Sequence, residues 1–244
     1  MPTAAQPLRA THSSSLTFRE ITREPELFEL FRLRHLVYSH QGYWDWESQQ
    51  LDIDSYDAHS RFIGAFTATN QLVGGARYIE AEGATHQKTL ESLTRRLKLA
   101  APAPRKHRYT AEALWDFSPL VQQAHDQGKT LVEFGRTVMH PDWQGSGLGR
   151  WLVFALYGLA LHNGESLGLA LVPPRLLGFY GRCGCVPLPR DGSAFFTHTE
   201  LVPVKVDLAH LGPAEAGSQR ARRDLGLHGS WVQSVETQTQ VSVA

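Results

Sequence analysis

The 244-residue sequence has only two cysteines and no apolar run long enough to span a bilayer. Cys183 and Cys185 flank a single glycine, which provides too few thiols for a disulfide framework or a four-ligand zinc site, so we expect reduced thiols. The longest apolar run, 151–161, falls well short of the roughly 20 residues of a membrane-spanning helix, and residues 1–15 lack a hydrophobic signal core. We therefore expect a cytoplasmic protein that is not integral to a membrane.

Net charge is also lacking, because 24 Lys and Arg residues balance 24 Asp and Glu residues. A neutral chain has no overall field that attracts nucleic acid, so we expect no nucleic-acid partner. The 12 histidines are scattered, and none forms an H-x-H or H-E-x-x-H pair with another. Because paired imidazoles on one face are typical of metal sites, we expect no metal.

The hydrophobic pattern predicts one folded domain over 16–207. Residues 1–15 and 208–244 are rich in small and polar residues, so we expect a flexible N-terminal segment and a flexible C-terminal tail. A helical insertion is expected at about 83–130. Periodicity predicts strands at 16–21, 61–67, 72–79, 131–139, 167–172 and 195–206, and helices at 25–38, 90–99, 113–126, 150–163 and 174–182. This order predicts an α/β fold with a mixed sheet between helices.

The strongest local motif is a glycine-rich turn at 144–149, between a predicted strand and a predicted apolar helix. Glycines without side chains allow successive backbone amides to approach an anion, and the start of the following helix adds a partial positive charge. The motif lacks the Gly-Lys-Ser/Thr ending of a P-loop and the third glycine of a dinucleotide fingerprint. A phosphate group other than those two cofactors fits the turn, and a tight turn without a ligand is the alternative.

Gln144-x-x-Gly147-x-Gly149 resembles the pyrophosphate loop of the GCN5-related N-acyltransferase superfamily, and 179–185 resembles a later segment of the same superfamily. The resemblance covers about 131–190. It implies a mostly antiparallel central sheet with helices on both faces, and a strand at 131–139 that splays from its neighbour. It implies no permanently bound cofactor but a phosphopantetheine thioester donor, either acyl-coenzyme A or an acyl carrier protein. The implied donor contacts are Val138, Met139, Gln144, Gly145, Ser146, Gly147, Leu148, Gly149 and Arg150.

A charged pattern in the rest of the chain resembles the acyl-homoserine-lactone synthases and the long-chain N-acyl amino acid synthases. Those families run Arg-x-x-Val-Phe/Tyr, Glu-x-Asp-x-Tyr/Phe-Asp, Arg and Glu-x-Ser-Arg. Asp52 replaces the first glutamate and Gly135 replaces the serine. The complete glycine turn favours the N-acyl amino acid branch. The matching residues are Arg34, Asp54, Asp57, Arg77, Glu133 and Arg136.

These charges predict a buried, nearly balanced ionic network beside the acceptor site, because single buried charges are costly. Its negative excess would suit an ammonium group. Unrelated surface charges are the alternative. The predicted acceptor-binding residues are Arg34, Trp44, Asp52, Asp54, Asp57 and Arg77.

The insertion carries six basic residues without an acidic residue among them. A solvated helix face explains such a cluster, and a docking surface for an acidic acyl carrier protein is the alternative. The residues are Arg95, Arg96, Lys98, Arg105, Lys106 and Arg108.

The predicted reaction is transfer of a fatty acyl group to the amine of an amino acid or a similar small acceptor. Glu133 is the expected base, Tyr180 the expected proton donor to the leaving sulfur, and Arg136 is expected to order the site. Amides near Val138 and Met139 are expected to hold the oxyanion. Short-chain acetyl transfer and a noncatalytic thioester-binding module remain alternatives. For the long-chain enzyme we expect an apolar tunnel lined by Phe62, Phe66, Trp115, Phe117 and Phe154.

Overall fold

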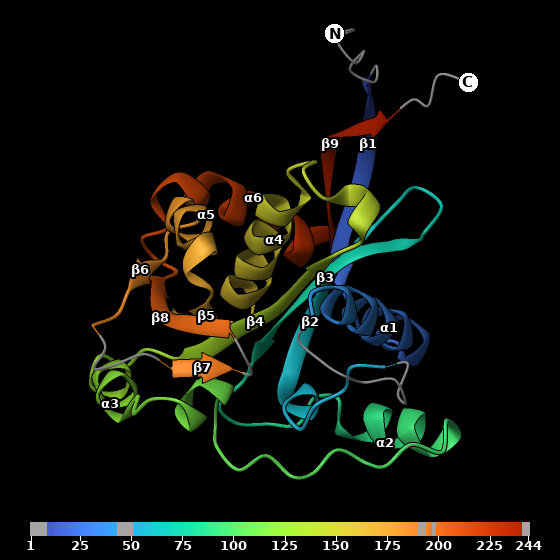
Figure 1. The fold of residues 1–244 in the computed structure, drawn as a ribbon. Helices are drawn as coiled ribbons and strands as arrows, with labels where there is room; N and C mark the ends of the chain where they lie inside the picture. The colour runs from blue at the N-terminus through green and yellow to red at the C-terminus, as the bar shows by residue number, and fades with distance from the viewer. Residues whose placement is uncertain (1–8, 43–50, 190–193, 197–198, 241–244) are drawn as a thin grey trace, which may run out of the picture.

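The computed structural model describes residues 9–42, 51–189, 194–196 and 199–240, which fold around one twisted central sheet (Figure 1). Its strands run in the order β6-β8-β5-β4-β3-β2-β1-β9, and β7 pairs with β8. Only β4 and β5 pair in parallel; the other pairs among the described strands are antiparallel. The strands are β1 (Arg9–Glu20), β2 (Ser60–Phe66), β3 (Leu72–Ile79), β4 (Leu131–Met139), β5 (Leu167–Val172), β6 (Val186–Pro187), β7 (Ala194–Phe196), β8 (Thr199–Asp207) and β9 (Ser230–Gln240).

Helices cover both faces of this sheet, as the family resemblance implied. Gly74 and Gly75 are consecutive residues of β3 and therefore face opposite sides. A side chain at Gly75 would collide with Leu30 of α1 (Glu24–His40), whereas one at Gly74 would contact Leu148 of α4 (Leu148–His162) at 3.3 Å. The helices are α1 (Glu24–His40), α2 (Gln87–Arg96), α3 (Ser118–Asp126), α4 (Leu148–His162), α5 (Leu177–Arg182) and α6 (Glu215–His228), with short 3-10 helices η1 (Asp57–His59), η2 (Thr110–Ala113), η3 (Pro141–Trp143), η4 (Pro174–Leu176) and η5 (Gly212–Ala214).

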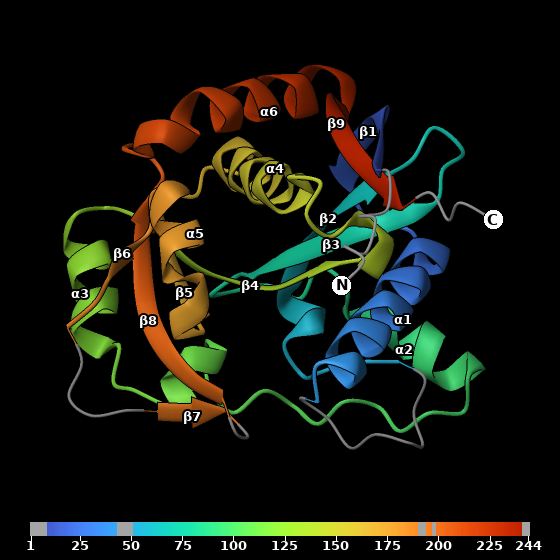
Figure 2. The same ribbon diagram turned by 45° about the horizontal axis from the view of Figure 1, so that its top comes forward.

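The apolar helix α4 lies between the sheet and α6 (Figure 2). Its sequence is apolar on nearly all sides, which is the pattern of a helix buried on every face. Gly158 allows α6 to approach closely, because a Cβ there would lie 2.6 Å from the Cβ of Ala221. The helix begins directly after Gly147, so the fold places the glycine turn at its N-terminus.

Strands β4 and β5 separate part of the way along their length. They pair from Leu131 and Leu167 as far as Phe134 and Ala170, although β4 continues to Met139 and β5 to Val172. On its other edge, β4 has a bulge opposite Gly75 and Arg77, where Arg136 adopts a φ of 52°. The implied splay is therefore present, and it opens beside the C-terminal half of β4.

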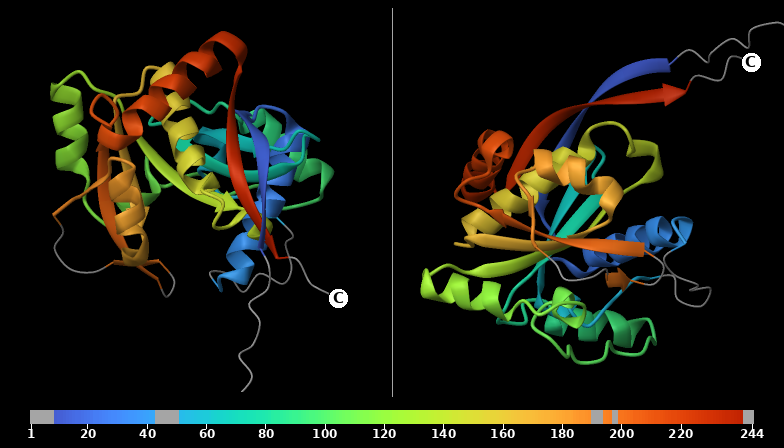
Figure 3. Two further views of the ribbon diagram at one scale, coloured as in Figure 1. Left: turned by 90° about the horizontal axis from the view of Figure 1, so that it is seen from above. Right: turned by 60° about the vertical axis from the view of Figure 1, so that its left-hand side comes forward.

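The prediction of a flexible tail over 208–244 is wrong for the described residues. Helix α6 packs on α4, and β9 pairs with β1 from Ser230 opposite Arg19 to Gln240 opposite Arg9. The paired strands project beyond the rest of the sheet (Figure 3). The sequence did not predict β9 because its side chains are mostly polar and because its partner, β1, lies more than 200 residues earlier in the chain.

The N-terminal prediction is also wrong in part, because β1 begins at Arg9 rather than near 16, while 1–8 lie outside the described residues. The single extended piece predicted over 195–206 is two antiparallel strands, β7 and β8. The insertion is helical as expected and contains α2, η2 and α3. No helix in the described part of the chain has the length and apolar character needed to cross a membrane.

Candidate active site

A cavity of about 730 Å³ occupies the opening between β4 and β5. Its wall includes β4 from Glu133 to Met139 and the β5 residues 170–172, with α5 contributing Tyr180. Helix α1 and the insertion close other sides through Tyr38 and Thr110. The predicted site residues that reach this one cavity are Asp54, Arg77, Glu133, Arg136, Val138, Met139, Gln144 and Tyr180.

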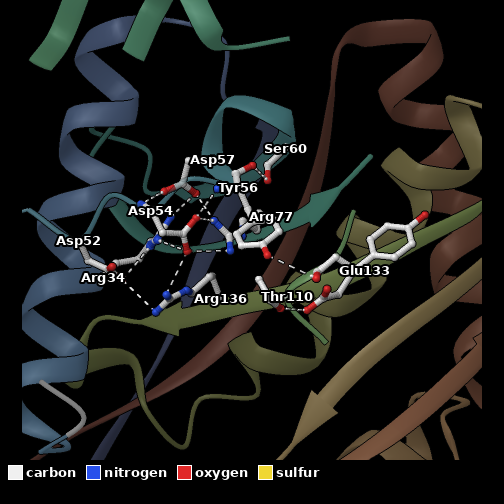
Figure 4. Close-up of polar contacts among 11 residues, drawn as sticks. Arg34, Asp52, Asp54, Tyr56, Asp57, Ser60, Arg77, Thr110, Glu133 and Arg136 are labelled. Carbon is white, nitrogen blue, oxygen red and sulfur yellow. Dashed lines mark hydrogen bonds and ion pairs between the residues drawn. The ribbon is translucent and has the colours of Figure 1, made fainter. Parts of the chain in front are cut away.

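The predicted ionic network is present and lies between α1 and the bulge of β4 (Figure 4). Arg34 of α1 contacts Asp52 at 3.1 Å, Asp57 at 2.7 Å and Asp54 at 3.8 Å. Arg77 of β3 donates two hydrogen bonds to Asp54, at 2.7 and 2.9 Å, and also contacts Asp57. The three aspartates therefore bind two arginines from two different elements.

Arg136 completes the network from the bulge. Its guanidinium lies 3.2 Å from Asp52 and 3.0 Å from Asp54, and it stacks over the Tyr38 ring at 5.3 Å. A left-handed backbone conformation at a residue other than glycine costs about 1–3 kcal/mol and persists only where its surroundings hold it. The two ion pairs and the contact with the tyrosine ring stabilise this backbone conformation at Arg136.

The network is a buried structural unit rather than a set of surface charges. Asp52 and Arg34 are 1% exposed, and Asp57 is fully buried. Three positive and three negative groups balance, so the six charges do not supply the negative excess that the sequence predicted. Burial alone would raise the pKa of Asp54, but the guanidinium groups of Arg77 and Arg136 hold that pKa well below its ordinary value. The Asp54 carboxylate therefore stays charged at neutral pH.

Glu133 lies apart from these ion pairs, on β4. Its carboxylate accepts a hydrogen bond from the Thr110 hydroxyl and another from the Ala111 amide at 3.2 Å, both from η2 of the insertion. The residue is 4% exposed. Burial raises the pKa of Glu133, and the bond from Thr110 partly offsets this rise. A carboxylate with a raised pKa is a better base near neutral pH.

Tyr180 of α5 lines the same cavity as Glu133. Burial raises its pKa to about 12, with Thr137 of β4 acting in the opposite direction through a hydrogen bond. The phenol is therefore protonated at neutral pH and able to donate a proton. The geometry thus combines a buried base and a protonated hydroxyl on one cavity.

The glycine turn follows β4 and η3 directly. Gly145 and Gly147 have φ values of 78° and 80°, which favour glycine. The Ser146 hydroxyl donates to the Trp143 carbonyl at 2.6 Å and accepts from the Leu148 amide at 3.3 Å, which holds the turn in shape. Within the described residues, the amides of Gly145 and Gly147 have no acceptor. They are free to bind an anion.

Most of the predicted donor contacts at 144–150 do not line the main cavity. Gln144 alone among 144–150 borders the main cavity, while Arg150 borders a second cavity. Gly135, which replaces the family serine, also lines the main cavity, and a Cβ there would meet no atom within 4 Å. This departure widens the site without disturbing its packing. Trp44 lies outside the described residues.

The basic residues of the insertion have mixed roles. Arg96 pairs with Glu24 at 2.9 Å. Arg105 donates to the carbonyls of Glu80 and Ala81 at 3.1 and 2.9 Å, so it holds the insertion against the segment that follows β3. The other four side chains are exposed on the surface. These four are Arg95, Lys98, Lys106 and Arg108.

The predicted tunnel lining is wrong. Phe62 and Phe66 pack in the core beneath α1, Trp115 and Phe117 pack around the insertion, and Phe154 borders the second cavity instead. Aromatic type alone does not indicate which side of an element faces a cavity. The apolar residues that line it include Val153, Leu156, Leu171, Val172 and Leu176.

Sequence reasoning also missed Thr110 and Ala111, the partners of Glu133. Both lie in a short 3-10 helix with no motif, so their role depends on where the insertion packs. The only local signal is Glu112, which accepts from the amides of Arg108 and Tyr109 at 2.8 and 3.3 Å and so marks the start of η2.

A family model and several solved structures are similar to this chain. The family model described as N-acyl amino acid synthase FeeM matches residues 29–190. The acyl-homoserine lactone synthase BjaI, solved with SAM and isopentyl-CoA, superposes with a TM-score of 0.56 at 17% identity, covering 87% of this chain and 90% of that one. FeeM itself, from uncultured soil microbes, superposes with a TM-score of 0.54 at 14% identity, covering 87% and 98%.

The lactone synthase LasI has a TM-score of 0.52 at 15% identity, covering 90% of this chain and 96% of its own. No curated protein matches by sequence. At these identities the superpositions show a shared fold, whereas the family model spans more than half of the 244 residues. The chain therefore belongs to the N-acyl amino acid synthase FeeM family and is an acyltransferase.

Proposed function

We propose that the protein transfers a fatty acyl group from a phosphopantetheine thioester, carried by coenzyme A or by an acyl carrier protein, to the amine of an amino acid or similar small acceptor. One observation carries this proposal. Glu133, Tyr180 and the splayed edge of β4 all border a single cavity. That cavity lies next to a glycine turn with two amides that are free among the described residues.

The donor is held along the splay in this proposal. Pantetheine has amide groups that pair with free backbone groups, as a third strand would between β4 and β5. The His140 amide donates to the Val73 carbonyl at 2.9 Å, so alternate amides of β4 point toward β3. Met139 lies between such positions and directs its amide toward the cavity side. This alternation favours Met139 over Val138 as the oxyanion donor.

Glu133 acts as the general base. An α-ammonium group has a pKa of about 8, so most of an amine acceptor is protonated at neutral pH and must lose a proton before it attacks the thioester. The buried carboxylate takes that proton directly or through a water. As the carbonyl carbon–sulfur bond breaks, Tyr180 donates its proton to the leaving thiolate, and the second proton of the attacking nitrogen passes to the tyrosinate through water, which leaves a neutral amide and restores the phenol. The balanced network and Arg136 keep the bulge of β4 in position.

The apolar lining supports a long acyl chain over acetyl. Val153, Leu156 and Leu171 offer a hydrocarbon chain a surface that an acetyl group does not use. The volume of about 730 Å³ lies within the range of about 300–1,000 Å³ typical of pockets for drug-sized ligands. Short-chain acetyl transfer would leave most of this space to water.

The test is a coupled measurement with purified protein. A panel of acyl-coenzyme A donors of increasing chain length is mixed with a panel of amino acids, thiol release is followed by absorbance, and the product is identified by mass spectrometry. We expect acceptor-dependent thiol release and an N-acyl amino acid, with faster turnover of long chains. Binding of the thioester without any acceptor-dependent release would establish the noncatalytic module instead, and full turnover by Glu133→Gln would remove the proposed base.

A further inference from the structure

A second cavity, of about 600 Å³, borders the first turn of α4, directly after the glycine turn in the sequence. It is lined by the start of α4, by α5, by the first half of α6 and by β9. Neither the acceptor nor the acyl chain in the proposed function occupies this space. The side chains that define its chemistry are Arg150, Trp151, Phe179, Arg182, Arg220 and Trp231.

Aromatic rings and guanidinium groups together form this wall. Trp151 and Trp231 pack edge to face with ring centroids 5.8 Å apart, and the Arg150 guanidinium lies 4.5 Å from the Trp151 ring centroid. Among the described residues, neither Arg150 nor Arg182 has a carboxylate partner, and Arg220 has only Asp224 at 3.6 Å. Such a wall fits a ligand that combines a planar aromatic ring with anionic groups.

The glycine turn lies in the sequence between a residue of the main cavity and a residue of the second cavity. Gln144 borders the main cavity and Arg150, six residues later, borders the second one. The consecutive α5 residues also line different cavities, because Tyr180 borders the main cavity and Phe179 borders the second one. Phe179 lies close to the turn, since a Cβ at Gly149 would be 3.6 Å from its ring. A ligand that runs from Tyr180 past the free amides of the turn therefore reaches the second cavity at its far end.

From this order we propose that the second cavity binds the 3′-phosphorylated adenosine of coenzyme A, which makes acyl-coenzyme A the donor. The inference rests on the proposed function, because it assumes that the thioester lies in the main cavity and the diphosphate at the turn. The adenine would stack on the aromatic wall, and the arginines would bind the phosphates. Arg220 and Trp231 come from the C-terminal segment beyond the family match over 29–190.

An acyl carrier protein fits this arrangement less well. Its phosphopantetheine arm ends on a serine phosphate, so it has no nucleoside to fill an aromatic cavity. The exposed basic side chains of the insertion lie between the end of α2 and the start of η2 in the sequence, and η2 contacts β4 at Glu133. The glycine turn follows the opposite end of β4, which is nine residues or about 30 Å long. The basic cluster is therefore not beside the glycine turn, where the phosphate is proposed to bind.

The first test measures binding without catalysis. Adenosine 3′,5′-bisphosphate is titrated calorimetrically into the wild-type protein, into Arg182→Gln and into the control Arg223→Gln, which changes an exposed arginine of α6 outside the cavity lining. We expect saturable binding, weakened about 10-fold in Arg182→Gln by loss of one charged hydrogen bond and unchanged in the control. No binding to the wild type, or equal weakening in both variants, would overturn the proposal.

The second test compares donors that carry the same acyl chain. We expect the KM for acyl-coenzyme A to be at least 10-fold below that for acyl-phosphopantetheine, and Arg182→Gln to narrow this ratio. Equal KM values, or a lower KM for an acyl carrier protein, would refute the nucleotide site as the basis of donor choice. Absence of amide product with every donor, together with intact binding of the bisphosphate, would refute the proposed function and still support the site.

Discussion

Replacing Thr110 with valine tests whether Glu133 is the base, because Thr110 lies on the insertion and not on the strand that carries Glu133. The substitution removes the hydroxyl that donates to the Glu133 carboxylate but keeps a similar volume. The Ala111 amide, at 3.2 Å, remains as the second donor. The carboxylate therefore stays in place with one hydrogen bond fewer.

The direction of the pKa shift in Thr110→Val follows from which form of Glu133 the lost hydrogen bond stabilises, namely the charged carboxylate. Burial raises the pKa of Glu133 and the bond from Thr110 lowers it, so loss of that bond raises the pKa further. A hydrogen bond to a charged group contributes about 1.5–3 kcal/mol. Because one pKa unit corresponds to about 1.4 kcal/mol, and because a second donor remains, we expect an upward shift of about one unit.

The assay is the pH dependence of kcat/KM, measured by thiol release with saturating acceptor. The base must be deprotonated, so activity falls as pH drops through the pKa of Glu133. We expect the acid limb of the wild-type profile to lie above the ordinary glutamate pKa of about 4.5, and the limb of Thr110→Val to lie about one pH unit higher. On the acid limb the variant should be about 10-fold slower, with near-normal rates on the plateau.

Thr85→Val is the matched control, because Thr85 donates to Glu80 at 3.0 Å on the exposed part of the insertion. Its profile should coincide with that of the wild type. An acid limb that stays in place in Thr110→Val, or that moves equally in the control, would show that Glu133 does not set the protonation state required for turnover.

Three further predictions concern the network, the proton donor and the turn. Arg34→Ala removes one of the two arginine partners of the buried Asp52 and Asp57 and leaves a net negative charge in the network. It should cost about 3–5 kcal/mol of unfolding free energy by denaturant titration, whereas Arg32→Ala on the exposed face of α1 should change it by less than about 0.5 kcal/mol. An unaffected Arg34→Ala would contradict the buried network. Tyr180→Phe should lower kcat by about 100-fold or more with alkyl thioesters. The loss should be far smaller with aryl thioesters, because an aryl thiolate leaves without being protonated. Equal losses of kcat for both substrates would exclude proton donation by Tyr180. Gly147→Ala strains a φ of 80° and should raise the KM for the donor several-fold while kcat at saturation changes less.

Local patterns determined much of this protein. The bounds of β4 and β5 follow from their apolar runs and flanking turns, and they agree with the predicted ranges residue for residue. The glycine turn and the buried helix after it can likewise be predicted, because a positive φ favours glycine and burial on nearly every side favours apolar residues. The charged pattern in the sequence contains all six members of the network, although it also includes Glu133, which lies apart from the ion pairs.

Tertiary structure decided the rest, because each remaining feature depends on residues far apart in the chain. Strand β9 is polar and forms only by pairing with β1, so composition alone indicated a tail. The Glu133 carboxylate is separated from the network because η2 of the insertion donates to it. The same packing decides which apolar side chains face the cavity. A side chain's type shows that it will be buried, but only the assembled sheet and helices determine what it is buried against.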